Sequence, residues 1–193
     1  MINQIGIIIR TYDRYIEFME PLSKQLKEAG FYVVVGYDAV EKMPPCSAVN
    51  ACDHFFSGGG LKGKQWGDIH NIRIGLRHLL DEGKEYAFCV NGDAVITQPE
   101  KIVDLIDILG EDDVLTTQWH GVCGNIILFG HTHKLREAYE IVPNHGRPQH
   151  EKKMTTAFNE IGVKYAIHPC RANNKGTWGL IGYSRSSENY NPG

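Results

Sequence analysis

Polar side chains stand directly after each apolar run of this 193-residue chain that we interpret as a buried strand. The clearest case is FCVNGD, in which Asp93 follows three apolar residues and the pair Asn91-Gly92. Carboxylate oxygens bind hard cations such as Mg²⁺, and a cation held there can neutralise a phosphate group. The strand-end set comprises Arg10, Thr11, Tyr12 and Arg14 after the first run, Asp38 after the second, Asn91, Gly92 and Asp93 after the third, and His168 in the last.

The elements that must position these side chains alternate between strand and helix. β-branched apolar runs predict strands at 5–10, 31–38, 85–90, 114–119, 125–130 and 163–169. Amphipathic spacing predicts helices at 15–29, from Asp68 to about 83, at 100–109, 135–141 and 151–162. This order predicts an α/β fold with a mixed, mostly parallel sheet flanked by helices, in which ligands bind beyond the carboxyl ends of the strands.

Composition limits the class of protein. The 42% hydrophobic and 22% charged content is ordinary for a globular domain, and the length suits one domain. A net charge of -3 gives no general attraction to nucleic acid or anionic lipid. The apolar runs are far shorter than the roughly 20 residues of a membrane helix. Five scattered cysteines without a C-x-x-C pair fit a reducing compartment. We therefore expect a cytoplasmic protein without a membrane anchor.

Taken in order, the segments resemble a small and divergent GT-A fold glycosyltransferase of the family 2 type. The resemblance covers about residues 1–170, and leaves 171–193 as a polar C-terminal tail. It is carried by RTYDR after the first strand, KGKQWGDIHNIRIGL at 62–76, and KEYAFCVNGDAVITQPEKI at 84–102. The later segments are CGNIILFGHTHKLREA at 123–138 and HEKKMTTAFNEIGVKYAIHP at 150–169. The resemblance implies a single-domain, Rossmann-like catalytic unit.

The resemblance also implies a reaction and roles for residues. The donor would be a UDP- or GDP-linked sugar, transferred to an acceptor hydroxyl. Asp93, with His168 as a second ligand, would hold Mn²⁺ or Mg²⁺ against the diphosphate. Glu151 would be the catalytic base if the enzyme inverts, and has no role if it retains. The implied nucleotide-sugar-binding residues are Arg10, Thr11, Tyr12, Arg14, Asp38, Lys64, Asp68, Arg73, Asn91, Gly92 and Asp93.

Several of these positions have a simpler interpretation. Asp68 is expected to cap its helix, and Lys64 and Arg73 can be solvated charges that reach no phosphate. Residues 41–63, rich in Pro and Gly, are predicted to form an irregular loop, either a lid over the donor or without a role. Asn91 stands where the family has the first acid of its D-x-D motif, and His150 replaces the Glu of a Glu-Asp pair.

Two other functions are compatible with parts of the sequence. Asp68-Ile69-His70, Gly92-Asp93, Gly124-Asn125 and Gly130-His131-Thr132-His133 resemble the ligand motifs of metallophosphoesterases. In that family the Asp-x-His ends a buried strand, whereas residues 61–67 do not predict one. We therefore do not favour this function and interpret His131 and His133 as turn residues. A nucleotide-sugar-binding protein without activity is the other alternative, supported by Asn91. The acceptor of a transferase is open: a glycan, a protein or a modified nucleic-acid base.

Overall fold

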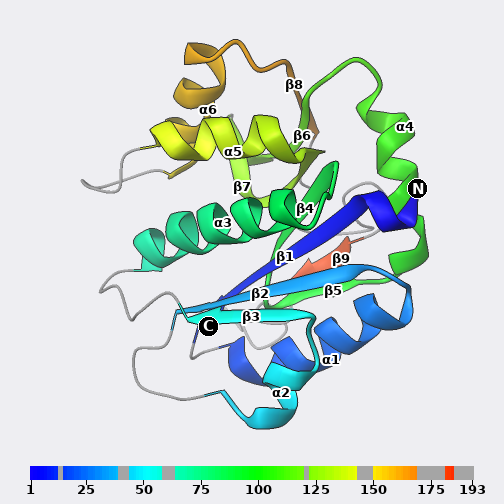
Figure 1. Cartoon of the computed structure of the whole chain (residues 1–193). Coiled ribbons are helices and arrows are strands. Elements are labelled where there is room, and N and C mark those ends of the chain that lie inside the picture. The colour runs from blue at the N-terminus through cyan, green and yellow to red at the C-terminus, as the bar shows by residue number, and fades with distance from the viewer. Residues whose placement is uncertain are drawn as a thin grey trace, which may run out of the picture.

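A seven-stranded sheet forms the centre of the molecule (Figure 1). The computed structural model describes residues 1–12, 15–38, 44–57, 64–119, 122–142, 150–168 and 181–184. The strand order is β3-β2-β1-β4-β7-β6-β8, and β7 runs antiparallel to both its neighbours while the other pairs are parallel. This confirms the mixed, mostly parallel sheet. The strands are β1 (Ile5–Tyr12), β2 (Tyr32–Asp38), β3 (His54–Ser57), β4 (Tyr86–Asn91), β6 (Val114–Trp119), β7 (Val122–His131) and β8 (Tyr165–His168).

Helices cover both faces of this sheet. In Figure 1, α3, α5 and α6 lie above the sheet, and α1 and α2 lie below it. The helices are α1 (Ile16–Glu28), α2 (Cys46–Asn50), α3 (Lys64–Asp81), α4 (Leu105–Leu109), α5 (Thr132–Ile141) and α6 (His150–Glu160). Two 3-10 helices, η1 (Ile2–Gln4) and η3 (Pro99–Asp104), complete the set in the described ranges. Gly30, at φ 91°, follows α1 as predicted.

Each face of the sheet has its own hydrophobic core, which explains why the strands read as unbroken apolar runs. Ile5, Ile7 and Ile9 of β1 face α1, where they pack with Met19 and other residues. Ile8 faces the opposite way, into the cluster formed with α3, α5 and α6. Because all four isoleucines are fully buried, neither face of β1 could carry alternating polar residues without loss of core packing.

The structure corrects three expectations. Residues 41–63 were predicted to be irregular, but they contain α2 and the edge strand β3, which pairs with β2. Asp68 was expected to cap a helix, but α3 begins four residues earlier, at Lys64. His131 and His133 are not in a turn, since His131 ends β7 and His133 lies in the first turn of α5. In each case a helix or strand includes residues of types that are common in turns.

A second, two-stranded sheet joins distant parts of the chain. β5 (Ala94–Ile96) pairs antiparallel with β9 (Ile181–Ser184), with Ala94 opposite Ser184. Gln25 of α1 donates from Nε2 to the carbonyl of Ile96 at 2.8 Å, which ties β5 to the main body. Part of the predicted polar tail is therefore a strand, and it ends beside the residue that follows Asp93. The predicted division of the chain at residue 170 is otherwise untested.

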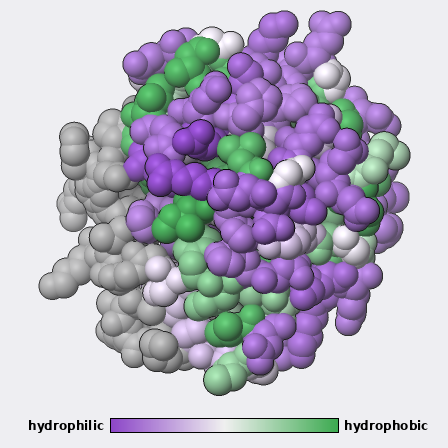
Figure 2. Space-filling model, in the orientation of Figure 1, coloured by the Kyte–Doolittle hydropathy of each residue, from purple (hydrophilic) through white to green (hydrophobic). Residues whose placement is uncertain are grey.

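The described surface is largely polar. The face seen in Figure 2 is covered mostly by hydrophilic residues, with hydrophobic ones between them. Among the described residues, the exposed large hydrophobic side chains are Met1, Ile108, Ile141 and Ile167, which belong to four separate segments. None of the described helices combines the length and hydropathy needed to cross a bilayer.

Candidate functional site

The carboxyl ends of β1, β2 and β4 bring the polar strand-end residues to one edge of the sheet. The parallel register sets Arg10 beside Asn91 and Tyr12 beside Asp38. The chain then turns from β4 into β5 through Gly92 and Asp93. The structure therefore brings together residues from three strands that are up to about 80 positions apart in the sequence. This is the edge at which ligands of open α/β sheets bind.

Charged groups at this edge are buried. The exposed fractions are 2% for Arg10, 6% for Asp38 and 3% for Asp93. Removing ionised groups from water is costly unless partners and hydrogen bonds compensate. Burying a guanidinium and two carboxylates at the ends of adjacent strands costs desolvation free energy that the fold alone does not require. These buried groups therefore mark this edge as the candidate site.

Arg10 and Asn91 are in direct contact. Nε of Arg10 donates to Oδ1 of Asn91 at 2.5 Å, across the β1–β4 pairing. Asn91 is the position of the first D-x-D acid in the resemblance, and its only side-chain oxygen is engaged by a cationic partner. A divalent cation would meet that guanidinium, whereas Asp93 keeps a carboxylate near the same edge. In the described part of the chain, no group of three His, Cys, Asp or Glu residues is arranged to hold a metal.

This edge therefore offers fewer ligands for a divalent cation than the two acids of a D-x-D motif would. Mg²⁺ is commonly held by one or two carboxylates together with substrate phosphates, so Asp93 alone is compatible with it. His168 lies at the end of β8, opposite Thr117 of β6, and only its backbone is described. Three strand spacings separate β4 from β8, about 14 Å across the sheet. The two predicted ligands therefore come from strands that are not neighbours.

The layer between the sheet and α3 changes from apolar to polar toward this edge. Ile8 and Cys89 occupy it first, and Arg10 and Asn91 follow two residues further along the same strands. Asn71, only 1% exposed, enters the layer from α3. Asn71 was not predicted as a site residue; the available signal was an amide directly before Ile72 on a helix that is otherwise apolar toward the sheet.

Gly36 makes room for Asn71. A Cβ placed on Gly36 would lie 2.8 Å from Cβ of Asn71 and 2.8 Å from Cζ of Phe56. Real Cβ atoms do not approach so closely, so a side chain at Gly36 would push α3 away from β2. Oδ1 of Asn71 is buried and has no hydrogen-bond partner in the described structure. The approach of α3 to β2 therefore leaves a polar atom beside the strand that ends in Asp38.

Gly92 makes the corresponding close contact on the other side of the sheet. Its amide donates to the carbonyl of Arg10 at 2.8 Å, and its Cα lies against the side chain of Thr11. A Cβ at Gly92 would be 2.6 Å from Cβ of Thr11. The Thr11 hydroxyl is buried and has no partner among the described residues. Thr11 thus supports the turn that carries Asp93, in addition to its predicted role beside the nucleoside.

Cys89 reports on the electrostatics under the site. Burial raises the pKa of this thiol to about 12, and the guanidinium of Arg10 opposes that shift. The thiol is therefore neutral at physiological pH and acts as a small apolar core residue, as its position in a strand predicted.

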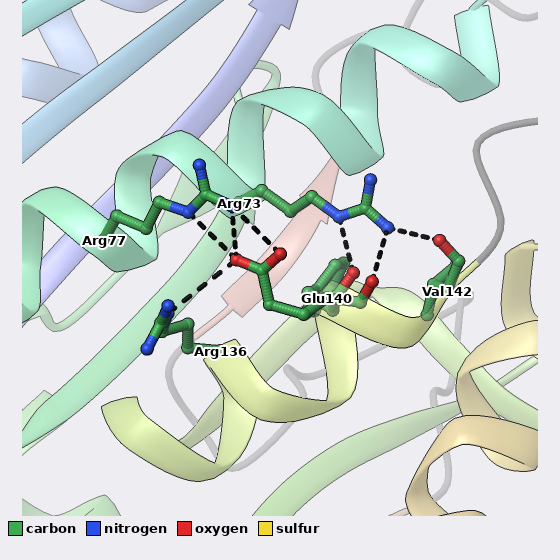
Figure 3. A network of polar contacts seen from close by, with 6 residues as sticks. Arg73, Arg77, Arg136, Glu140 and Val142 are labelled. Atoms are coloured by element: carbon green, nitrogen blue, oxygen red, sulfur yellow. Dashed lines mark hydrogen bonds and ion pairs between the residues drawn. The ribbon is translucent and has the colours of Figure 1, made fainter.

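Arg73 of α3 contacts the end of α5 (Figure 3). Its Nε donates to the carbonyl of Tyr139 at 2.5 Å, and its Nη2 donates to the carbonyls of Glu140, at 3.4 Å, and Val142. The guanidinium therefore binds the carboxyl end of α5. Burial lowers the pKa of Arg73, while Glu140 opposes this shift. The described contacts of this predicted nucleotide-sugar ligand are thus with α5, and its role beside the donor stays a prediction.

Some predicted residues fall outside the described atoms. Arg14 lies outside the described residues. Lys64 and Asp68 belong to the first turns of α3, and Glu151 to the first turn of α6, but the structure describes only the backbone of these three. The roles assigned to these four residues stay predictions.

The metallophosphoesterase motifs do not converge. Asp68 and His70 lie within α3 rather than at the end of a strand. His131 pairs with Tyr86, the first residue of β4, whereas Asp93 follows the last. Five residue steps of β4 separate these ends, about 17 Å. Motif residues that a metallophosphoesterase would need around two cations therefore lie at opposite ends of the sheet.

Several solved structures share this fold. A proposed nucleotide-diphospho-sugar transferase from Desulfovibrio desulfuricans G20 superposes with a TM-score of 0.58 at 8% identity, over 86% of this chain and 80% of that one. A glycosyltransferase involved in the glycosylation of the major capsid of PBCV-1 gives 0.58 at 12% identity, over 88% and 84%. The 4-diphosphocytidyl-2C-methyl-D-erythritol synthase of Anaerococcus prevotii DSM 20548 gives 0.58 at 10% identity, over 97% and 94%.

These similarities concern the fold. No protein-family model matches the sequence, and no curated protein matches it either. The chain has the α/β fold of nucleotide-sugar transferases and of nucleotidyltransferases.

Proposed function

We propose that this chain, which has the fold of nucleotide-sugar transferases, binds a UDP- or GDP-linked sugar and transfers the sugar to an acceptor hydroxyl. The observation that carries the proposal is the buried polar cluster at the carboxyl ends of β1, β2 and β4. It contains Arg10, Asp38, Asn91 and Asp93, and occupies the edge at which open α/β sheets bind nucleotides. The solved structures with the same fold support a donor of this chemical class.

In the proposed reaction, an acceptor oxygen attacks the anomeric carbon of the donor sugar. The new carbon–oxygen bond forms as the bond from that carbon to the diphosphate breaks, and the nucleoside diphosphate leaves with the bonding electrons. Glu151 takes the acceptor proton if the reaction inverts configuration. Thr11, Tyr12 and Asp38 line the nucleoside. Lys64 and Asp68, at the start of α3, are proposed to lie beside the donor, as is Arg14.

The charge that develops on the diphosphate has to be neutralised. Asp93 would hold Mg²⁺ or Mn²⁺ there with the phosphate oxygens, and His168 is the proposed second ligand. Such a cation stabilises the leaving diphosphate by direct charge neutralisation. Arg10 places a fixed positive charge next to Asn91 and contributes to the same end. Because Arg10 is present, we expect transfer to be reduced but not abolished when the metal is removed.

A second candidate is nucleotidyl transfer, since a nucleotidyltransferase shares the fold over 97% of this chain. In that reaction a phosphate oxygen attacks the α-phosphorus of a nucleoside triphosphate, and pyrophosphate leaves. The two reactions differ in their products: glycosyl transfer releases a nucleoside diphosphate, and nucleotidyl transfer releases pyrophosphate.

The test is a thermal-shift panel of nucleotide sugars, nucleoside diphosphates and nucleoside triphosphates, each with Mn²⁺ and with a chelator. A ligand at one hundred times its dissociation constant stabilises the fold by about 2.7 kcal/mol, enough for a clear rise in Tm. We expect a UDP- or GDP-sugar to give the largest rise. Donors that shift Tm are then incubated with acceptors of the three classes, and the released nucleotide is identified.

The outcomes separate the alternatives. Release of a nucleoside diphosphate with a glycosylated product supports the proposal. Binding without any turnover of donor favours a nucleotide-sugar-binding protein, and pyrophosphate release from a triphosphate favours nucleotidyl transfer. If no nucleotide shifts Tm, the proposal is wrong.

A further inference from the structure

The carboxyl end of α5 is stabilised from another helix. Val142, at φ -63° and ψ 122°, ends α5 in extended backbone instead of the left-handed turn that commonly closes a helix. The next residue in the sequence is Pro143, which has no amide hydrogen to donate back to the last turn. The final carbonyls of α5 are therefore open to donors other than that amide, such as side chains or water.

Arg73 of α3 supplies those donors. It binds the carbonyls of Tyr139, Glu140 and Val142, so that one guanidinium contacts three carbonyls at the end of the helix (Figure 3). The positive charge also suits the negative end of the helix dipole. Arg73 is partly buried, and these three contacts go to backbone atoms, so they bear directly on the course of the chain.

Arg77, one turn further along α3, makes a different kind of contact. It binds the carboxylate of Glu140 through Nε at 2.9 Å and through Nη2 at 2.7 and 3.0 Å. Arg136 approaches the same carboxylate, at 3.7 Å. The side chain of Arg77 is 55% exposed, and exposed pairs of this kind contribute little to stability. Arg77 is thus a matched arginine that touches α5 without holding its backbone.

The end of α5 is linked to the start of α6 through the core. The side chain of Val142 is 1% exposed and belongs to the same hydrophobic cluster as Met154, which is fully buried. Met154 lies in α6, three residues after Glu151. The carbonyl of Val142 is held by Arg73, and its side chain packs in the cluster that holds α6.

We infer that Arg73 is a positioning residue: by binding the last carbonyls of α5, it sets the start of α6, and with it Glu151, relative to α3. The inference rests on the proposed function for the role of Glu151. It assigns Arg73 to the acceptor side of the reaction, through the backbone of α5, and removes it from the set that touches the donor.

The test compares Arg73→Gln with Arg77→Gln by hydrogen–deuterium exchange. Arg73→Gln leaves carbonyls of α5 without their donors, and we expect amides at 153–157 in α6 to exchange about tenfold faster. Arg77→Gln should leave α6 unchanged. Exchange that rises only within α5, equally in both variants, or uniformly over the chain would overturn the inference. This measurement does not depend on any activity. If Arg73→Gln does not fold, Arg73→Lys keeps the charge but loses the fork, and is measured instead.

A second, kinetic experiment follows once the wild-type protein has been shown to form a transferred product. Arg73→Gln should lower kcat by between about tenfold and a hundredfold while the donor Kd stays unchanged, because displacing a catalytic group costs rate and not donor binding. In a Glu151→Gln background the same change should have no further effect, since both act on one group. Additive losses, or a weaker donor Kd, contradict the inference; absence of transfer by the wild type contradicts the proposed function instead.

Discussion

Polar residues are partly exposed at the amino end of β1, β2 and β4, whereas charged residues are buried at the carboxyl end. At the amino end, Tyr32 binds His78 through its hydroxyl at 2.9 Å, and the rings of His54 and His78 stack with centroids 3.8 Å apart. These groups are partly exposed and serve one another as partners. At the carboxyl end, Arg10 and Asp93 are buried charges. A polar cluster that stabilises a fold can remain half in water, whereas buried charges reduce what the fold gains from burial.

This contrast has a practical meaning. Substitutions at the amino end should change stability and leave ligand binding unaffected. Substitutions at the carboxyl end should affect ligand binding, whether or not they also change the free energy of unfolding.

Asp93→Asn keeps the shape of the side chain and removes its charge. We expect transfer to fall by about 10² to 10³ fold, the loss typical of a group that stabilises charge in the transition state. The Tm without ligand should change by only a few degrees. The control is Asp107→Asn, since Asp107 is exposed on α4. Full metal-dependent transfer by Asp93→Asn would remove the role given to this residue.

Gly92→Ala and Gly6→Ala place the same methyl group at opposite ends of the sheet. At Gly92 the new Cβ would lie 2.6 Å from Cβ of Thr11, which cannot move without its strand. At Gly6 it would lie 2.7 Å from Cδ1 of Leu79, the flexible end of a side chain. Each should cost about 1–3 kcal/mol of stability by overpacking. Measured by calorimetric titration with the donor, affinity should fall about tenfold for Gly92→Ala only; equal losses of affinity would argue against the contrast.

The smallest expected effect is a pH dependence at the amino end. Burial and the neighbouring His78 lower the pKa of His54, against a smaller opposing influence of Glu82. A histidine with a lowered pKa stabilises the fold fully above its unfolded pKa of about 6.5, and this stabilisation is lost as pH falls below that value. Urea unfolding at pH 7.5 and 5.5 should show a smaller acid loss for His54→Gln. His133→Gln, at an exposed position, should behave as the wild type; identical curves for both variants would contradict the prediction.

Much of the fold could be predicted from local pattern, and the exceptions share a physical cause. Strands β1, β2 and β4 were predicted from their β-branched runs because both faces are buried. The short strands β3, β5 and β9 were not predicted. β5 has three residues, and its partner lies about ninety positions further along the chain. Such pairing depends on the tertiary structure and produces no periodicity in the sequence.

The features of the site also differ in whether they could be predicted from the sequence. The gathering of Arg10, Asp38, Asn91 and Asp93 at one edge followed from the parallel sheet, which the sequence predicted. The contacts of Asn71 and Arg73 could not be predicted, because one depends on how closely α3 approaches Gly36 and the other on where α5 ends. The predicted roles of Glu151 and His168 remain to be tested by experiment.

The pairing of Ala94 with Ser184 also has a consequence for the order of folding. Contacts between residues so far apart require a long loop to close, and such contacts form late. A chain emerging from the ribosome can assemble β1, β2 and β4 well before residues 181–184 are available. We therefore expect the strand that follows Asp93 to acquire its partner in the final step, so that a nascent chain holds a nearly complete sheet before it becomes competent to bind its ligand.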